Sequence, residues 1–400
     1  MEHSTPSLPA AEPEATTPNW SLTARLAYRF AASYFIVFLV PRVLLWPLDL
    51  LGASWLGVSP SLMNPRSAGS GDRTVDWVHA LTVLILAVAG TVVWSVLDRK
   101  RREYTTALAW TRLAMRYVLA SVMLSYGLAK VFPMQFQPPT DGRLVQRFGD
   151  FSPMGLLWSF MGASMGYTIF SGAMEVLGGL LLLFRRTAVV GALFTAAVMA
   201  NVVALNMFYD VPVKLLSFHW LAFALVIAAP DLARLFRFLV LQKAVDPPFP
   251  AGPVFTKRHW RIVSWVGKAS VLALLIIQVQ GAHTRYASRP RPQQRLILGA
   301  YRVEGFPGWQ EVEVENAASM RVTRDDGTIT RYRLVNSGQS RLQLHDSAGR
   351  PAGSFSFRTA GVLEGDVNGE PTLLQMVASP ETFLLQQRGF HWINEVPFNR

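Results

Sequence analysis

An acidic residue in the middle of an apolar run is the first feature of this sequence that could do chemistry. Glu175 lies near the centre of Met165–Phe184, where an ionised carboxylate is costly in hydrocarbon. It must be protonated, paired with a cation or turned to a polar cavity. Gly178 and Gly179 follow on the same helical face and permit a close helix crossing. Two roles therefore stay open for Glu175: a proton relay or ligand contact, and a hydrogen-bonded packing group.

Two residues of an earlier apolar run, Thr111–Phe132, can be partners of Glu175. Lys130 is near the outer end of that run, where a lysine can extend its ammonium to the lipid–water interface. Glu175 lies roughly 13 Å from the outer end of its own helix at about 1.5 Å per residue, which makes pairing with Lys130 unfavourable. Tyr126, one turn deeper, is predicted as the better-placed partner. We predict that Glu175→Gln keeps the fold but loses activity or ligand retention; wild-type behaviour would leave only the packing role.

A second group of polar side chains lies along the next two apolar runs and at the turn between them. Its members are Asn201, Asn206, Tyr209, Asp210, Lys214 and His219. Together they predict an outward-facing polar pocket. Packing is the alternative, because Asn in membrane helices also hydrogen-bonds neighbouring helices. Pro212 predicts a fixed, tight turn between the two runs.

The loop before the run Trp77–Leu97 adds outer-surface candidates. Asp72 and Asp76 could receive a cation, and the alternative is a solvated turn that leads into a helix. His79 and His219 each lie about one turn below the outer surface, and two histidines from different helices can ligate a haem. One such pair is a weak signal. We predict no metal site, and the sequence contains no HExxH, Walker or GxGxxG motif.

The composition places these residues in a membrane protein. Hydrophobic residues make up 51% of the 400 residues and charged residues 16%, whereas soluble domains carry about a quarter charged residues. No cysteine is present, which excludes disulfides, thiolate metal sites, iron–sulfur clusters and a cysteine nucleophile. The net charge of +12 does not require nucleic acid, because basic residues of membrane proteins collect on cytoplasmic loops. We predict the lipid bilayer as a partner and no nucleic acid.

Seven apolar runs come near the length of about 20 residues that a membrane-spanning helix needs. They are Leu22–Leu39, Trp77–Leu97, Thr111–Phe132, Met165–Phe184, Ala188–Tyr209, Leu215–Ala229 and Trp260–Gln280. Pro41 and Pro47 should kink or end the first run, and the sixth can extend to Phe238. The fold class expected is therefore an all-α membrane bundle of about seven transmembrane helices.

A shorter apolar stretch, Met154–Ser164, cannot span a membrane. It is predicted as a re-entrant or interfacial helix that Ser152 caps and Pro153 begins. Basic residues gather on alternate loops, for example Arg99 to Arg102 and then Arg185 with Arg186. This bias predicts a cytoplasmic N-terminus and an extracytoplasmic C-terminus in a bacterial inner membrane.

The tail from about residue 285 changes to short alternating runs. They are Leu296–Val303, Met320–Thr323, Ile329–Leu334, Leu342–Leu344, Ser354–Phe357, Leu373–Val377 and Phe383–Leu385. Asp326-Gly327 and Asn368-Gly369 lie between runs, and such pairs are strong hairpin signals. We predict an antiparallel β domain, either a meander or a small up-and-down, lipocalin-like barrel.

These patterns divide the chain into five parts. Residues 1–20 are expected to be a disordered tail, and residues 21–110 hold two transmembrane helices and an outer loop. Residues 111–240 form a four-helix transmembrane core. Residues 241–284 hold a cytoplasmic loop and the last transmembrane helix, and residues 285–400 form the extracytoplasmic β domain.

Short motifs in the four-helix core carry a family resemblance. GLAK (residues 127–130) ends one helix, EVLGG (residues 175–179) lies in the next, and a basic turn follows at residues 185–186. In these features residues 111–238 resemble the DoxX-like family of bacterial integral membrane proteins. The ending RGFHWINEVPFNR (residues 388–400) is also similar to the endings of longer DoxX-like proteins.

The resemblance implies a link to quinones. Some DoxX-like proteins are similar to subunits of thiosulfate:quinone oxidoreductases, so quinone is the cofactor that the analogy offers. We expect a membrane protein that binds a small molecule or quinone as a redox-associated accessory subunit, with Glu175 as its buried acid. The alternatives are a proton-coupled transporter and an assembly factor that binds a membrane or periplasmic protein through its β domain. A self-contained enzyme is the least supported class, because the chain has no recognised cofactor motif.

Overall fold

The computed structural model describes most of the chain. The described residues are 20–63, 71–139, 143–144, 146, 148–245, 258–287, 299–316, 318–336, 341–359 and 361–377. The predicted strand Phe383–Leu385 and the family-like ending at residues 388–400 lie outside them. The chain separates into two compact units. One comprises Met1–Met123, Leu177–Met207 and Pro212–Val266, and the other Leu124–Val176, Phe208–Val211 and Gly267–Arg400.

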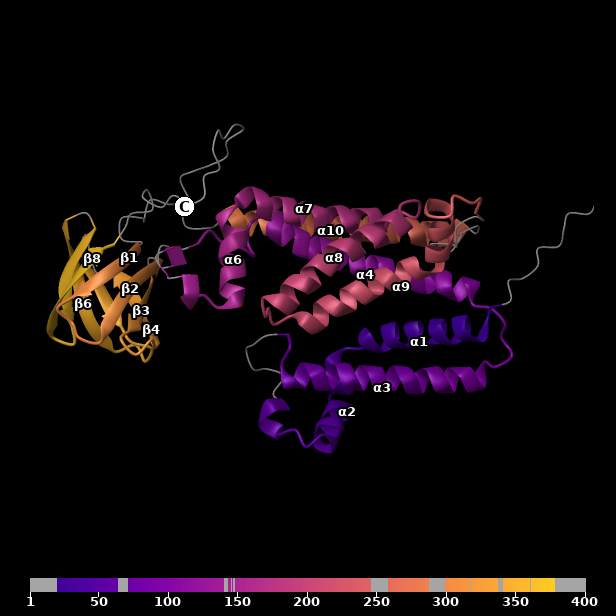
Figure 1. The fold of residues 1–400 in the computed structure, drawn as a ribbon, viewed down its shortest axis with the longest axis horizontal. Helices are drawn as coiled ribbons and strands as arrows, with labels where there is room; N and C mark the ends of the chain where they lie inside the picture. The colour runs from indigo at the N-terminus through magenta and orange to yellow at the C-terminus, as the bar shows by residue number, and fades with distance from the viewer. Residues whose placement is uncertain are drawn as a thin grey trace, which may run out of the picture. The chain divides into compact units, whose positions relative to one another are not determined.

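The first part of the chain is helical (Figure 1). Its elements are α1 (Leu22–Phe38), α2 (Arg42–Trp55), η1 (Pro60–Met63), α3 (Thr74–Leu97), α4 (Thr105–Val131), η2 (Phe148–Asp150), α6 (Pro153–Ala163), α7 (Met165–Leu183), α8 (Ala188–Phe208), α9 (Lys214–Leu239) and α10 (Arg258–Ala287). Each predicted apolar run is a helix. Within the described residues α3, α4, α7, α8 and α9 are long and apolar enough to cross a membrane, and the bent pair α1–α2 would add a sixth span. The full count of seven stays a prediction.

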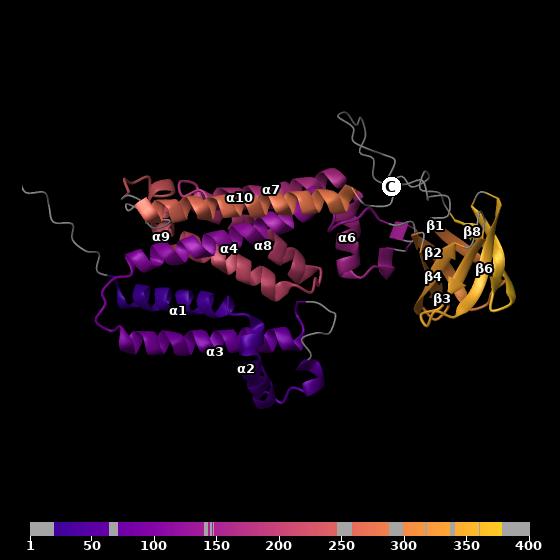
Figure 2. The same ribbon diagram turned by 180° about the vertical axis from the view of Figure 1, so that it is seen from behind.

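A sharp corner follows the first apolar run. α1 ends at Phe38, and α2 begins at Arg42 at an angle of 105° to it. Pro41 is the N-cap residue of α2 and Pro47 lies inside it. The first run therefore ends near Pro41, as the sequence predicted, but the second helix that follows the corner was not foreseen. α1 and α3 lie side by side in both views (Figure 1, Figure 2).

Two local predictions about helix ends are confirmed. The Ser152 hydroxyl accepts a hydrogen bond from the Gly155 amide at 3.1 Å, and Pro153 is the first residue of α6. α9 continues through Pro230 to Leu239, which is the extension that the sequence allowed. Whether α6 is re-entrant stays a prediction.

The helices of the first unit share an apolar core. Its buried members are Phe35, Met115, Leu119, Ala120, Met123, Leu182, Ala192, Ala196, Met199, Phe223, Ala224, Ile227 and Ala228. They come from α1, α4, α7, α8 and α9. Alanines are frequent among them, and small side chains let helices approach closely where lipid gives no hydrophobic drive for association.

The second part of the chain is a closed antiparallel barrel of eight strands. They are β1 (Gly299–Glu304), β2 (Trp309–Asn316), β3 (Ser319–Arg324), β4 (Ile329–Asn336), β5 (Arg341–His345), β6 (Pro351–Thr359), β7 (Val362–Val367) and β8 (Glu370–Met376). Neighbours in sequence pair with each other, and β1 pairs with β8 to close the ring. The β domain is thus an up-and-down barrel and not an open meander. The sequence analysis missed β2 and β7.

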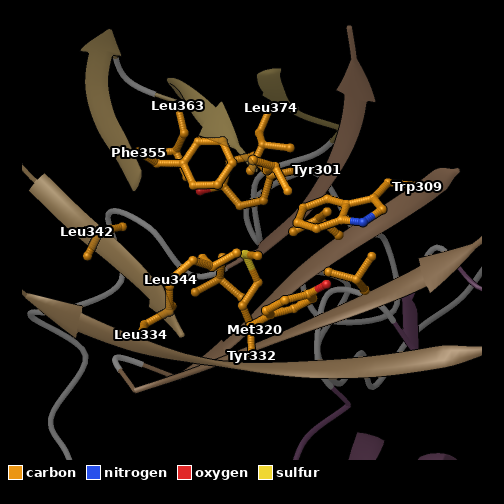
Figure 3. Close-up of a cluster of buried hydrophobic side chains, with 14 residues drawn as sticks. Tyr301, Trp309, Met320, Tyr332, Leu334, Leu342, Leu344, Phe355, Leu363 and Leu374 are labelled. Carbon is orange, nitrogen blue, oxygen red and sulfur yellow. The ribbon is translucent and has the colours of Figure 1, made fainter. Parts of the chain in front are cut away.

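Side chains of its own strands fill the barrel (Figure 3). Fourteen buried residues form one cluster: Tyr301, Trp309, Val312, Val314, Met320, Val322, Tyr332, Leu334, Leu342, Leu344, Phe355, Leu363, Val367 and Leu374. An eight-stranded barrel has an interior that side chains can fill. At the β7–β8 turn Asn368 and Gly369 both have positive φ, 52° and 86°, as a two-residue type I′ hairpin requires. The Asn-Gly signal therefore identified a real turn.

Candidate functional site

Glu175 is paired with Lys130, and Tyr126 is not its partner. The Lys130 ammonium donates hydrogen bonds to both carboxylate oxygens of Glu175 at 2.8 Å. The two side chains are 9% and 3% exposed. Tyr126 is 45% exposed, and its ring centroid is 6.0 Å from the Lys130 Nζ. Lys130 thus points into the protein and does not extend to the interface as one interpretation expected.

Two glycines explain why the depth argument failed. A Cβ atom on Gly127 would lie 2.7 Å from the Gly172 carbonyl oxygen, and one on Gly172 would lie 2.6 Å from that of Gly127. The α4 and α7 backbones therefore touch at this crossing, with Lys130 and Glu175 one turn along each helix. α7 starts ten residues before Glu175, whereas α4 ends one residue after Lys130. The depth estimate assumed that the two helices end at the same level, and they do not.

Lys130 and Glu175 form a closed pair, in the sense that each buried charge is matched by the other. Both carboxylate oxygens already accept from the same ammonium, and a buried pair of this kind is costly to break from one side. Gly178 serves another contact, because a Cβ atom there would lie 2.7 Å from the Thr195 hydroxyl. This geometry favours a structural role for Glu175 over a proton relay.

A pocket of about 110 Å³ lies in the first unit, between α1, α3 and α9. Its lining residues are Phe38, Gly71, Asp76, His79, Ala80, Val83, Leu215, Leu216 and His219. We call it the His79 pocket. It brings together candidates from two separate sequence groups, Asp76 and His79 in α3 and His219 in α9. Asn201 and Asn206 are not part of it, so α3 and not α8 provides the facing wall.

His79 is held by a buried carboxylate. Its Nδ1 is 2.9 Å from the Asp49 Oδ2, and Asp49 is fully buried. An ionised carboxylate can only accept, so Nδ1 carries the hydrogen and Nε2 is the ring nitrogen left for a ligand. The Arg42 Nε is 3.8 Å from the same Asp49 oxygen. An imidazole oriented in this way can accept a proton at Nε2 or, once protonated, donate one.

His219 has no free ring nitrogen. Its Nδ1 is 2.6 Å from the Leu215 carbonyl oxygen and its Nε2 is 2.6 Å from the Tyr34 hydroxyl. A carbonyl only accepts, so these partners assign the proton to Nδ1 and make Nε2 the acceptor for Tyr34. The Phe38 ring stacks on the imidazole at 4.8 Å between centroids. Because both nitrogens are engaged, the geometry argues against the His79–His219 haem alternative.

Asp72, just before α3, and Asp76, in its first turn, both have protein partners. Asp76 binds the Arg42 and Arg73 guanidinium groups at 2.7 and 2.9 Å. Asp72 accepts from the backbone amides of Lys214 at 2.7 Å and Leu215 at 3.0 Å. These amides begin α9, where helices leave donors unsatisfied and favour negative charge. Asp72 therefore caps α9 although it lies 142 residues earlier in the chain. The geometry of these aspartates gives no support to the hypothesis that they receive a cation.

The other residues of the predicted polar stripe are dispersed. Asn201 is exposed, Asn206 is buried and Tyr209 is half-buried. Asp210 is exposed and adopts a positive φ of 50°, consistent with the tight turn that Pro212 predicted. The backbone oxygen of Pro212 accepts from the Gly71 amide at 2.8 Å, which helps to hold the pocket wall next to α9.

Sequence reasoning missed three functional candidates, Asp49, Arg42 and Tyr34. The Asp49 signal was present, because it is an acidic residue inside the apolar stretch WPLDLLG and such residues are rare without a partner. A second buried ion pair was also missed. Arg112 and Asp231, almost fully buried, are 2.7 Å apart. Such pairs form only where particular helices pack together, and the sequence pattern does not show which helices do so. Among the described residues no group of three or more His, Cys, Asp or Glu could hold a metal ion.

Comparison with known proteins gives one relative. The chain is 33% identical over 131 residues to the uncharacterized protein YwoB of Bacillus subtilis (strain 168). The aligned stretch covers 82% of that protein and 33% of this chain. The chain belongs to the same family as YwoB. That relative's name states no activity, and most of the present chain lies outside the match. No family model matches the chain, and no solved structure matches it.

Proposed function

We propose that the protein is a multi-pass membrane protein that binds a small, single-ring molecule such as a quinone head group in the His79 pocket. The observation that supports this most is the Asp49–His79 pair beside an otherwise largely apolar wall. Ligand sites combine apolar surface with a few fixed polar groups. Glu175, the acid first expected in this role, is neutralised by Lys130, so the proposed site moves to His79.

The chemistry of a quinone fits the pocket. Phe38, Val83 and Leu216 offer apolar surface to a ring. The His79 Nε2 can donate to a quinone carbonyl when protonated and accept from a hydroquinone hydroxyl when neutral. The volume of about 110 Å³ is smaller than that of a dry cavity of about 150 Å³ that binds benzene. One ring is therefore the largest group the pocket admits, and any tail extends beyond it.

The proposal includes a topology. We propose about seven spans around a DoxX-like four-helix core in a bacterial inner membrane, with the N-terminus cytoplasmic. The basic loops and the apolar helices support this arrangement. The GLAK and EVLGG motifs, on which the resemblance rests, supply Lys130 and Glu175 to one buried contact. In this topology the His79 pocket faces the extracytoplasmic side.

Ligand analysis of protein purified gently from its native membrane tests the proposal. We expect a bound quinone in the solvent extract by mass spectrometry and in the redox difference spectrum. A short-chain benzoquinone should bind the wild type and the control variant His345→Gln, whose site is in β5. It should bind His79→Gln more weakly. Equal binding by all three proteins would exclude the His79 pocket as the site.

A second candidate function is assembly through the barrel. Fourteen buried side chains fill the barrel interior, so a lipocalin-like ligand inside it finds no space among the described strands. The barrel would then act through its outer face, on a membrane or periplasmic protein as partner. A stable co-purifying protein would support this candidate, while counterflow in proteoliposomes would favour the proton-coupled transporter instead.

A further inference from the structure

α2 carries an apolar stripe that is open to the surroundings. Leu44, Leu48, Leu51 and Trp55 recur at spacings of four, three and four, which puts them on one helical face. They are 67%, 41%, 59% and 89% exposed. Such a stripe facing water is unfavourable, at roughly 25 cal/mol for each Å² of apolar surface. Something apolar must therefore cover it.

The opposite face of α2 packs against α3, and this contact determines the direction in which the stripe points. Leu45, Asp49 and Ala53 are buried, and α2 packs against α3. A Cβ atom on Gly52 would lie 3.9 Å from both Val78 and Thr82 of α3. The Asp49–His79 contact lies on this same face. α2 can therefore not roll its stripe towards α3 without breaking these contacts.

The level of α2 along α3 identifies what covers the stripe. Arg42, at the start of α2, binds Asp76, and Gly52 lies beside Thr82. These α3 residues fall within about 12 Å of its N-terminal end at about 1.5 Å per residue. α2 is bent by 105° from α1, which runs alongside α3. In both views it projects from α3 on the side away from α1 (Figure 1, Figure 2).

We propose that α2 is an in-plane helix whose stripe lies in the lipid–water interface at the end of the membrane where α3 begins. If α1 and α3 cross the bilayer, a helix bent by 105° from α1 runs close to the plane of the bilayer. An apolar face with a tryptophan at its end is typical of interfacial helices. The inference rests on the proposed membrane crossing and is independent of the quinone site.

The lipid contact has a consequence for the pocket. Asp49 belongs to α2, whereas His79 belongs to α3. The lipid–water interface that keeps α2 in place therefore also keeps Asp49 in contact with His79. Displacement of α2 from the lipid would remove the carboxylate that orients the imidazole.

The absence of cysteine allows a direct test in the full-length protein. Leu51→Cys is labelled with a nitroxide and reconstituted in vesicles of phosphatidylethanolamine and phosphatidylglycerol. Collision with oxygen and with a water-soluble nickel chelate then reports depth. Two exposed positions are matched controls, Ile85→Cys in the middle of α3 and Lys100→Cys in the loop after it. Leu44→Cys repeats the measurement on the same stripe should Leu51→Cys not fold.

We expect the ratio of oxygen to nickel accessibility at residue 51 to lie between the high value of residue 85 and the low value of residue 100. A ratio equal to that of residue 100 would place the stripe in water and overturn the proposal. Shielding from both reagents would also overturn it, because a second copy or another protein would then cover the stripe. Loss of quinone binding alone would leave this result unchanged.

Discussion

Glu175 and Asp49 are both buried carboxylates on apolar helices, but their partners give them opposite characters. Both oxygens of Glu175 are bound by the ammonium of Lys130. Asp49 binds one nitrogen of His79, a residue that lines the His79 pocket. In the first pair each charge is matched within the contact, while the second leaves one ring nitrogen of a pocket-lining histidine for a ligand. A buried acid thus marks a candidate site. Whether that site can bind a ligand depends on whether the partner of the acid has a further polar atom to offer.

The largest expected effect comes from opening the closed pair. Lys130→Met leaves Glu175 buried without its cation, and removing one partner of such a pair costs about 3–5 kcal/mol. We expect a large drop in thermal stability of the reconstituted protein. The double variant Lys130→Met with Glu175→Met should recover much of it, because paired apolar replacements are often neutral. A double variant as unstable as the single one would contradict the closed-pair description.

The second prediction sharpens the contrast between the two acids. Asp49→Asn removes the charge that orients His79 and should weaken benzoquinone binding by about tenfold to a hundredfold, since hydrogen bonds to charged groups contribute about 1.5–3 kcal/mol. Titration of the reconstituted protein measures this. Glu175→Gln, where it folds, should bind as the wild type does, contrary to the expectation from sequence alone. The reverse order of effects would return the proposed site to Glu175.

A smaller effect is expected at the wall of the His79 pocket. Asp72→Ala removes the cap on α9, which costs about 0.5–2 kcal/mol at helix N-termini. Amide exchange at the start of α9 should become faster, while exchange in the middle of α9 stays unchanged. Asp72→Asn keeps an acceptor oxygen and serves as the control. Equal exchange in Asp72→Ala and the wild type would show that the contact contributes nothing.

The smallest effect concerns the barrel, at the partly buried Glu311 of β2. Burial raises the pKa of Glu311 above its usual value. Its folded-state pKa exceeds the unfolded value, so this contribution is most favourable below about pH 4 and is lost as pH rises through the raised pKa. Glu311→Gln should therefore stabilise β2 and β3 at neutral pH and lose that advantage below about pH 4. The size should stay below about 1 kcal/mol because the group is partly solvated.

Amide exchange of β2 and β3 in the full-length protein, corrected for intrinsic rates, measures that change. The exposed Glu364 provides the control variant Glu364→Gln. A stabilisation by Glu311→Gln that is the same at pH 4 and pH 7 would rule out titration as its cause.

Elements with one dominant periodic signal could be predicted from the sequence. Each apolar run became a helix, and Asn368-Gly369 became a hairpin turn, because both depend on local sterics and burial. α2 was missed because Pro41 and Pro47 read only as breakers. β2 was missed although Glu311 and Glu313 alternate with its valines, which is the period-two pattern of a strand with one buried face.

The sequence by itself determined the composition-driven features of this protein: its apolar helices, its antiparallel β domain and the positions of its isolated polar residues. The tertiary structure decided the pairings. Gly127 and Gly172 set the register that joins Lys130 to Glu175, and the corner before α2 brings Asp49 to His79. Local pattern fixes which faces are apolar, whereas partners 30 to 45 residues apart depend on how those faces pack against one another.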